Sequence, residues 1–82
     1  MDEVRSMKVL VEYIVKALVD HPEQILIAER SGMNTTILEL AVAKEDIGKV
    51  IGKEGRTINA IRTILNAAGA SQKKRVVLEV MG

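Results

Sequence analysis

The chain has 82 residues, 48% of them hydrophobic, and a formal net charge of +1. This composition supports one small packed domain over residues 1–82 and excludes a disordered chain. The absence of cysteine excludes disulfides and thiol chemistry and suits a reducing cytoplasm, where we expect the protein to be located. No apolar run approaches the ~20 residues of a membrane span, and the N-terminus lacks a signal-peptide pattern, so we expect no membrane association.

Aromatic residues are nearly absent, with one Tyr and no Phe or Trp. RRM, OB-fold and cold-shock domains stack bases on aromatic side chains, so the composition excludes these classes. The charges are uneven along the chain. Residues 1–34 hold six acids and four bases, and residues 35–82 hold five acids and eight bases. The basic excess in the second half indicates an anionic partner, although an imbalance this small also fits chance.

The first predicted element is an amphipathic helix over residues 3–19, because apolar residues recur there at steps of three and four. Its core stripe comprises Val4, Met7, Val11, Ile14 and Leu18, widened by Val15 and Val19. Val9, Leu10 and Tyr13 lie partly off this stripe and are candidates for a partner surface. The segment Asp20-His21-Pro22 ends the helix. His21 is the only histidine and has no visible partners for a metal or catalytic role.

A β-hairpin follows the first helix. Residues 24–30 form a short predicted strand, residues 31–34 a turn with Met33 exposed at its tip, and residues 35–43 a second strand. Alternation in the second strand places three residues inward and Glu39 outward. The inward residues are Leu38, Leu40 and Val42.

Two helices and a strand complete the chain. Glu45 and Asp46 stand in the first turn of a short helix, where the helix dipole favours acids, and Gly52 ends it. A longer helix follows Gly55 and runs to about residue 68, with Ile58, Ile61 and Leu65 toward the core. The segment 69–72 breaks it. The last strand covers residues 76–81, with Val76, Leu78 and Val80 on one face. The strands starting near residues 35 and 76 are joined by a helical crossover, which predicts that they are adjacent and parallel.

The chemistry-bearing motif is the pair Gly52 and Gly55, with Lys53 between them and Arg56 directly after. Glycine adopts positive φ and lets another backbone approach, and the following helix directs its N–H groups toward the loop. Such a loop is a plausible seat for a phosphate backbone. A P-loop is excluded by spacing, because the glycine after Gly48 comes one position early and Glu54 replaces the Ser or Thr. A dinucleotide fingerprint is excluded as well, because Val50 occupies the position of its first glycine.

The sequence from Asp46 to Ile58, DIGKVIGKEGRTI, resembles the signature of KH domains. The predicted order α-β-β-α-α-β resembles the type II, bacterial form of this family, and the resemblance covers nearly the whole chain. It implies an α+β fold with a three-stranded mixed sheet and helices packed on one face. It also implies a non-enzymatic protein that binds single-stranded RNA, without a cofactor or a small-molecule substrate.

The resemblance assigns roles to individual residues. In KH domains the G-x-x-G loop clamps a backbone of about four nucleotides, a role that falls here on Gly52, Lys53, Glu54 and Gly55. Lys49 and Arg56 are implied as phosphate neighbours. Candidate walls of an aliphatic base groove are Ile47, Ile51 and Ile58, each of which also fits core packing. A possible extension of the positive path, which also fits a solvated strand end, is Lys73, Lys74 and Arg75. Glu54 departs from the family pattern by placing an acid in the clamp, so we expect weak, sequence-tolerant binding.

Partners are also implied by the resemblance. Small stand-alone KH proteins of bacteria act as homodimers or as heterodimers with a larger KH protein of the KhpB (Jag, EloR) kind, in RNA chaperoning or post-transcriptional regulation and in pathways of cell elongation and shape. Two alternatives remain. One is a protein-interaction module with a vestigial RNA loop, acting through dimerisation. The other is a small enzyme, for which the sequence shows no catalytic or metal-binding set.

Overall fold

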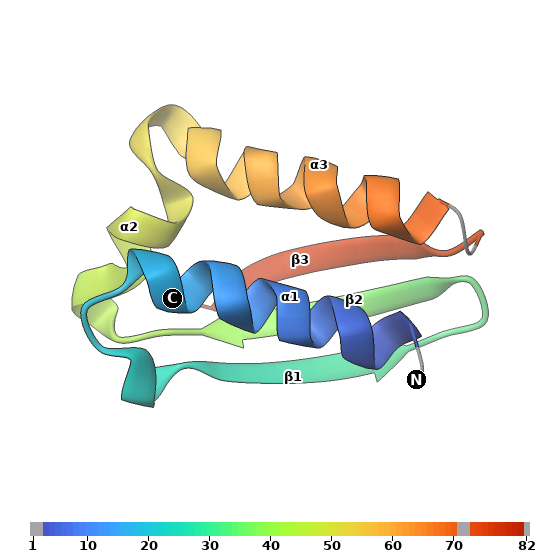
Figure 1. Ribbon diagram of the computed structural model, residues 1–82, viewed down its shortest axis with the longest axis horizontal. Helices are drawn as coiled ribbons and strands as arrows, with labels where there is room; N and C mark the ends of the chain where they lie inside the picture. The colour runs from blue at the N-terminus through green and yellow to red at the C-terminus, as the bar shows by residue number, and fades with distance from the viewer. Residues whose placement is uncertain (1–2, 71–72, 82) are drawn as a thin grey trace.

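The computed structural model describes residues 3–70 and 73–81, with side chains from Met7 onward. The side chain of Val4, and Ser71 and Gln72 of the predicted helix break, therefore lie outside what the structure describes. The elements follow the predicted order, with three short 3-10 turns between them (Figure 1). They are α1 (Glu3–Leu18), η1 (Pro22–Gln24), β1 (Leu26–Ser31), β2 (Thr35–Ala41), η2 (Lys44–Asp46), α2 (Ile47–Ile51), η3 (Lys53–Gly55), α3 (Arg56–Ala70) and β3 (Arg75–Met81).

The three strands form one mixed sheet in the order β1-β2-β3. β1 and β2 are antiparallel, and β2 and β3 are parallel, as the helical crossover between them predicts. Register places Leu38 of β2 between Glu29 of β1 and Leu78 of β3. The expected type II KH architecture, an α+β fold with a three-stranded mixed sheet and helices on one face, is confirmed.

The core lies between one face of the sheet and the helices. Alternate residues of β2 and β3 point into it, and α1, α2 and α3 each contribute apolar side chains. The fully enclosed members are Met7, Val11, Val15, Leu38, Leu40, Val50, Ile58, Ile61, Leu65, Val76 and Leu78. The predicted inward residues Ile14, Leu18, Val42 and Val80 pack against this cluster but are only partly buried. Met33 at the hairpin tip is exposed, as expected.

The end of α3 corrects one prediction. Gly69 does not break the helix but lies within it, and the helix reaches Ala70. The Lys74 N–H donates to the Gly69 carbonyl, the Lys73 N–H donates to the Ala70 carbonyl, and Lys73 has a φ of 57°. These are the two hydrogen bonds and the left-handed residue of a Schellman motif. Gly69 serves close packing instead, because a Cβ there would stand 2.7 Å from the Lys74 carbonyl oxygen.

The fold gathers two groups of features at opposite ends of α3. The loop between α2 and α3, the end of α1 and the start of α1's connection to β1 lie at one end, and the β1–β2 hairpin lies near the other (Figure 1). The Arg75 N–H donates to the Asn34 carbonyl at 2.9 Å and ties β3 to this hairpin. No helix in the described ranges, 3–70 and 73–81, has the length and apolar character needed to cross a membrane.

Candidate nucleic-acid interface

The glycine loop is a single tight turn between α2 and α3. Gly52 ends α2 with φ 76° and ψ 172°, and Gly55 begins the passage into α3 with φ 74°. Between them Glu54 takes φ 56° and ψ 25°, a left-handed conformation for a residue with a side chain. The Gly55 N–H donates to the Gly52 carbonyl at 3.1 Å and closes the turn. The expected tight loop between two helices is therefore present.

Gly52 also lets the loop lie directly on the first turn of α3. A Cβ at Gly52 would overlap the Thr57 side chain and stand 2.9 Å from the Thr57 backbone nitrogen. Gly55 has room for a Cβ, whose nearest neighbour would be Asn59 Nδ2 at 3.6 Å. The first N–H groups of a helix lack partners within the helix and carry the positive end of its dipole. This close approach therefore brings the loop to the end of α3 that attracts anions.

Three charged side chains border the loop, and all are exposed: Lys53, Glu54 and Arg56. Arg56 Nη2 stands 4.0 Å from Glu54 Oε2, so the acid of the loop lies beside the arginine that follows it. Both side chains are more than two-thirds exposed, and exposed ion pairs contribute little to stability. The net charge of this group is +1, supplied by two cations and one acid.

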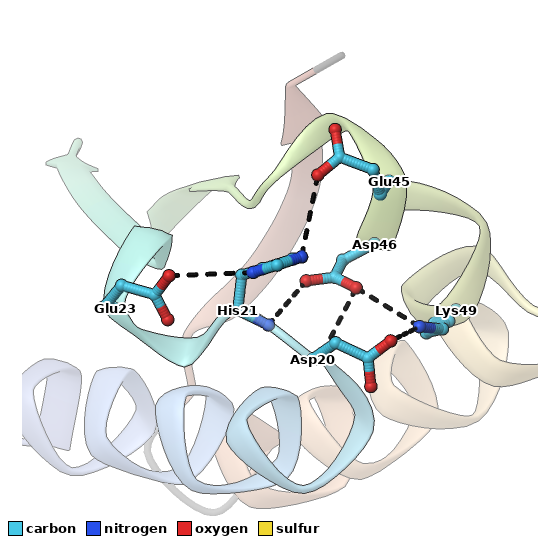
Figure 2. Close-up of polar contacts among 6 residues, drawn as sticks. All are labelled: Asp20, His21, Glu23, Glu45, Asp46 and Lys49. Carbon is cyan, nitrogen blue, oxygen red and sulfur yellow. Dashed lines mark hydrogen bonds and ion pairs between the residues drawn. The ribbon is translucent and has the colours of Figure 1, made fainter.

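Lys49, one of the two expected phosphate neighbours, contacts two carboxylates. Its ammonium contacts the Asp20 carboxylate and stands 3.4 Å from Asp46 Oδ1 (Figure 2). The hydrogen bond from Lys49 to Asp20 is the main cause that raises the pKa of Lys49 above its ordinary value. Lys49 thus points toward the end of α1, and its charge is shared with two carboxylates.

Asp46 differs from a simple helix-start acid. Its side chain is completely buried and makes no capping hydrogen bond within its own helix. It accepts hydrogen bonds from the backbone N–H groups of Asp20 at 3.1 Å and His21 at 2.9 Å (Figure 2). Burial by itself raises the pKa of Asp46, but these two bonds and Lys49 outweigh it and lower the pKa. The prediction that Asp46 serves the start of its own helix was therefore incomplete.

His21 occupies the connector between α1 and β1, as predicted. Its imidazole nitrogens stand 3.7 Å from Glu23 and 3.7 Å from Glu45, both of which are exposed (Figure 2). No group of three His, Cys, Asp or Glu side chains suited to a metal ion occurs within the described residues. The contacts of His21 are with single exposed carboxylates on either side of the ring.

The groove-wall candidates separate into two kinds. Ile58 is 4% exposed and belongs to the core, so it offers little surface to a ligand. Ile47 and Ile51 of α2 are half-buried and keep part of their surface in solvent. Lys73 and Arg75 are exposed and Lys74 is half-buried at the far end of α3 from the loop. At 1.5 Å per residue the 15-residue helix separates the two basic groups by about 22 Å.

A shallow hollow lies between the second half of α3 and the start of β3. It has a volume of about 150 Å³ and is lined by Arg62, Asn66, Arg75, Val76, Val77 and Leu78. Arg62 donates from Nε and Nη2 to the Leu78 carbonyl at 3.2 and 3.1 Å, and its Nη1 lies 3.5 Å from Asn59 Oδ1. A row of polar side chains therefore leads from the loop toward Arg75.

Sequence reasoning missed this row, although a signal was present. Asn59, Arg62 and Asn66 are spaced by three and four residues, the spacing of one helix face. None of the groove-wall candidates Ile47, Ile51 and Ile58 lines this hollow, which combines two arginines and an asparagine with three apolar residues of β3.

Comparison with known proteins gives one consistent result. The family described as KhpA/KhpB, KH domain, matches residues 8–80. A protein of Chlamydia pneumoniae named RNA-binding protein KhpA is 56% identical over 75 residues, which cover 92% of this chain and 96% of the relative. Proteins of the same name from Clostridium acetobutylicum and Halalkalibacterium halodurans are 52% and 47% identical, over 92% of this chain and 100% and 99% of the relatives. No solved structure gives a significant match.

Proposed function

The chain belongs to the KhpA/KhpB family of KH domains, and from this premise we propose that it is a single-stranded RNA-binding protein whose glycine loop clamps the RNA backbone. The observation that carries the proposal is the close packing of Gly52 against Thr57 in the first turn of α3. A phosphate at this seat meets helix N–H groups and the positive end of the dipole. Relatives of this chain named RNA-binding protein KhpA support the choice of RNA.

The clamp consists of Gly52, Lys53, Glu54 and Gly55, with Arg56 beside it. The glycines bring the backbone close to the phosphates, and Lys53 and Arg56 supply attraction at longer range. Glu54 lowers the positive charge of the loop, since it stands 4.0 Å from Arg56. One clamp of this charge gives weak binding that tolerates different sequences.

The bases follow α3 along the hollow at the β3 edge. Half-buried Ile47 and Ile51 offer apolar contact near the loop, and Ile58 supports this wall from within the core. Further along, the guanidinium planes of Arg62 and Arg75 replace the absent aromatic rings as stacking partners. Lys73 and Lys74 extend the positive path beyond Arg75.

The proposed cellular role is RNA chaperoning or post-transcriptional regulation in the cytoplasm. One small clamp has little affinity, and joining two clamps raises it through effective concentration. The chain therefore acts as a homodimer or as a heterodimer with a KhpB (Jag, EloR)-like protein. The match to a family whose description names both KhpA and KhpB supports this partner.

The test is binding to short single-stranded RNA, measured by fluorescence anisotropy across a salt series. The loop variant is Lys53→Asp plus Glu54→Asp, and the control is Arg30→Asp, which makes the same charge change at an exposed side chain of β1. We expect the wild type and the control to bind, with affinity that falls as salt rises, and the folded loop variant to lose binding. Equal binding by the loop variant and the control, or a flat salt dependence of the wild type, would contradict the proposed site.

A second candidate, a protein-interaction module, is favoured by the exposed apolar residues of α1. Tyr13 is 77% and Val9 57% exposed, and they line a hollow of about 160 Å³ with Glu12 and Lys16. Sedimentation at micromolar concentration, with and without RNA, separates the two candidates. A dimer that Tyr13→Ser disrupts, in a chain that binds no RNA, would favour this alternative.

A further inference from the structure

Two distant parts of the chain meet at the first turn of α2. Just after α1, the backbone N–H groups of Asp20 and His21 donate to the buried carboxylate of Asp46. Lys49 contacts the carboxylates of both Asp20 and Asp46 (Figure 2). We propose that Lys49 is a positioning residue, which fastens α2 to the end of α1 and so sets the place of the glycine loop. In this role it does not contact the RNA backbone.

The short helix α2 needs outside support. It has five residues, well below the ~12–15 residues at which an isolated helix becomes even marginally stable in water. Val50 is its one fully buried side chain, while Ile47 and Ile51 are half-buried. The contacts of Asp46 and Lys49 with the segment after α1 therefore add to the packing of Val50 in fixing α2 in place.

The same helix leads directly into the loop. Gly52 follows Ile51, and the Gly52 N–H donates to the Gly48 carbonyl at 2.9 Å. Gly52 also packs against Thr57 of α3 so closely that no Cβ would fit between them. A shift of α2 is therefore passed to the loop with no flexible segment between them.

The two lysines near the loop differ in what surrounds them. Lys49 is 44% exposed and contacts two carboxylates. Lys53 is exposed and, among the described residues, has no carboxylate within ion-pair distance. A phosphate that approached Lys49 would have to compete with Asp20 and would also meet that acid's charge. Lys53 presents its whole charge to solvent.

The experiment uses Lys49→Met and Lys53→Met as a matched pair, since each replaces a lysine by an uncharged side chain of similar length. Urea unfolding and the salt dependence of RNA anisotropy are measured for both. We expect Lys49→Met to lower the urea midpoint and keep the wild-type salt slope. We expect Lys53→Met to keep the urea midpoint and reduce the slope by about 0.7, the value for one phosphate of a single strand. A slope reduced in Lys49→Met as in Lys53→Met would overturn the inference.

Two further readouts remain valid if a variant is only weakly stable. Asp20→Asn changes an exposed acid, and its effect on the urea midpoint should be smaller in the Lys49→Met background, because coupled partners are not additive. Additive effects of the two substitutions on the urea midpoint would overturn the proposal that Lys49 fastens α2 to the end of α1. Amide exchange at Gly55, relative to that at Leu38 in the core, should be faster in Lys49→Met than in Lys53→Met. Equal exchange in the two variants would also count against loop positioning.

The pH profile gives a signature specific to the ammonium. The folded pKa of Lys49 is raised above 10.5, so its stabilisation is complete below pH 10.5 and is lost as pH rises through the folded pKa. We expect the alkaline loss of stability to be smaller in Lys49→Met than in the wild type, and identical profiles would contradict the tether. The effect of Lys49 on RNA binding rests on the proposed function. If neither the wild type nor any variant binds RNA, the proposed function fails while the unfolding and pH readouts still decide the tether.

Discussion

At the scale of single residues, the two glycines of the loop are required for different reasons. Gly52 combines φ 76° with ψ 172°, a region open essentially to glycine alone, and it also touches Thr57. Gly55 has a similar φ of 74°, but a Cβ there would make only ordinary contacts, the nearest with Asn59 Nδ2 at 3.6 Å. The loop therefore depends on conformation at both positions and on close packing at only one.

This difference predicts unequal effects of alanine. Gly55→Ala should lower the free energy of unfolding by roughly 1–2 kcal/mol, the strain of a left-handed residue. Gly52→Ala adds the displacement of Thr57 and should cost roughly 2–5 kcal/mol. Urea unfolding at neutral pH measures both. Equal costs in the two variants would mean that the contact with Thr57 relaxes without resistance.

At the scale of elements, the glycines inside α2 and α3 have different surroundings. Gly48 lies in α2 with no neighbouring atom within 4 Å of the place where a Cβ would stand, whereas Gly69 lies in α3 against the Lys74 carbonyl. No packing contact therefore requires a glycine at position 48 of α2. Gly69 allows the turn that leads to β3 to fold back onto its own helix.

Alanine should therefore have opposite effects in the two helices. Gly48→Ala should raise the free energy of unfolding by about 0.5–1 kcal/mol, because alanine loses less backbone entropy in a helix. Gly69→Ala should lower it by about 1–3 kcal/mol, since the turn at Lys74 must move. Thermal unfolding by circular dichroism gives the sign of each. A stabilised Gly69→Ala chain would show that the contact with Lys74 is easily relieved.

Elements were predictable from the sequence where their signals are local. The order of elements, the inward residues Leu38 and Leu40, and the turn at Gly52 all follow from periodicity and glycine conformation. The buried role of Asp46 joins residues 25 and 26 positions apart, and the contact of Arg62 with Leu78 spans 16. Those partners are set by packing, and no local pattern reveals them.

At the scale of the whole molecule, one core holds both the sheet and the glycine loop. Leu38 and Leu40 in the central strand face α1 and α3, and Val50 of α2 joins the same cluster. Within the described part of the chain the other face of the sheet carries no helix, and Leu26 on β1 is 71% exposed. Stability and the place of the loop therefore depend on one side of the sheet (Figure 1).

Leucine truncation on the two sides should reflect this asymmetry. Leu38→Ala should lower the free energy of unfolding by about 2–5 kcal/mol through lost burial and a cavity. Leu26→Ala should change it by less than about 0.5 kcal/mol, because the side chain is already in water. Both values come from urea unfolding. A large effect of Leu26→Ala would reveal that this face is covered in solution.

The contact between Arg62 and Leu78 has a consequence for solubility. β3 is an edge strand, and such strands offer unpaired backbone groups to which another chain can add. Arg62 reaches from α3 and occupies the Leu78 carbonyl with two donors, while its charge repels a like copy. The side chain that lines the hollow thus also keeps the Leu78 carbonyl from pairing with a strand of another copy. Replacing Arg62 to study binding also uncovers that edge.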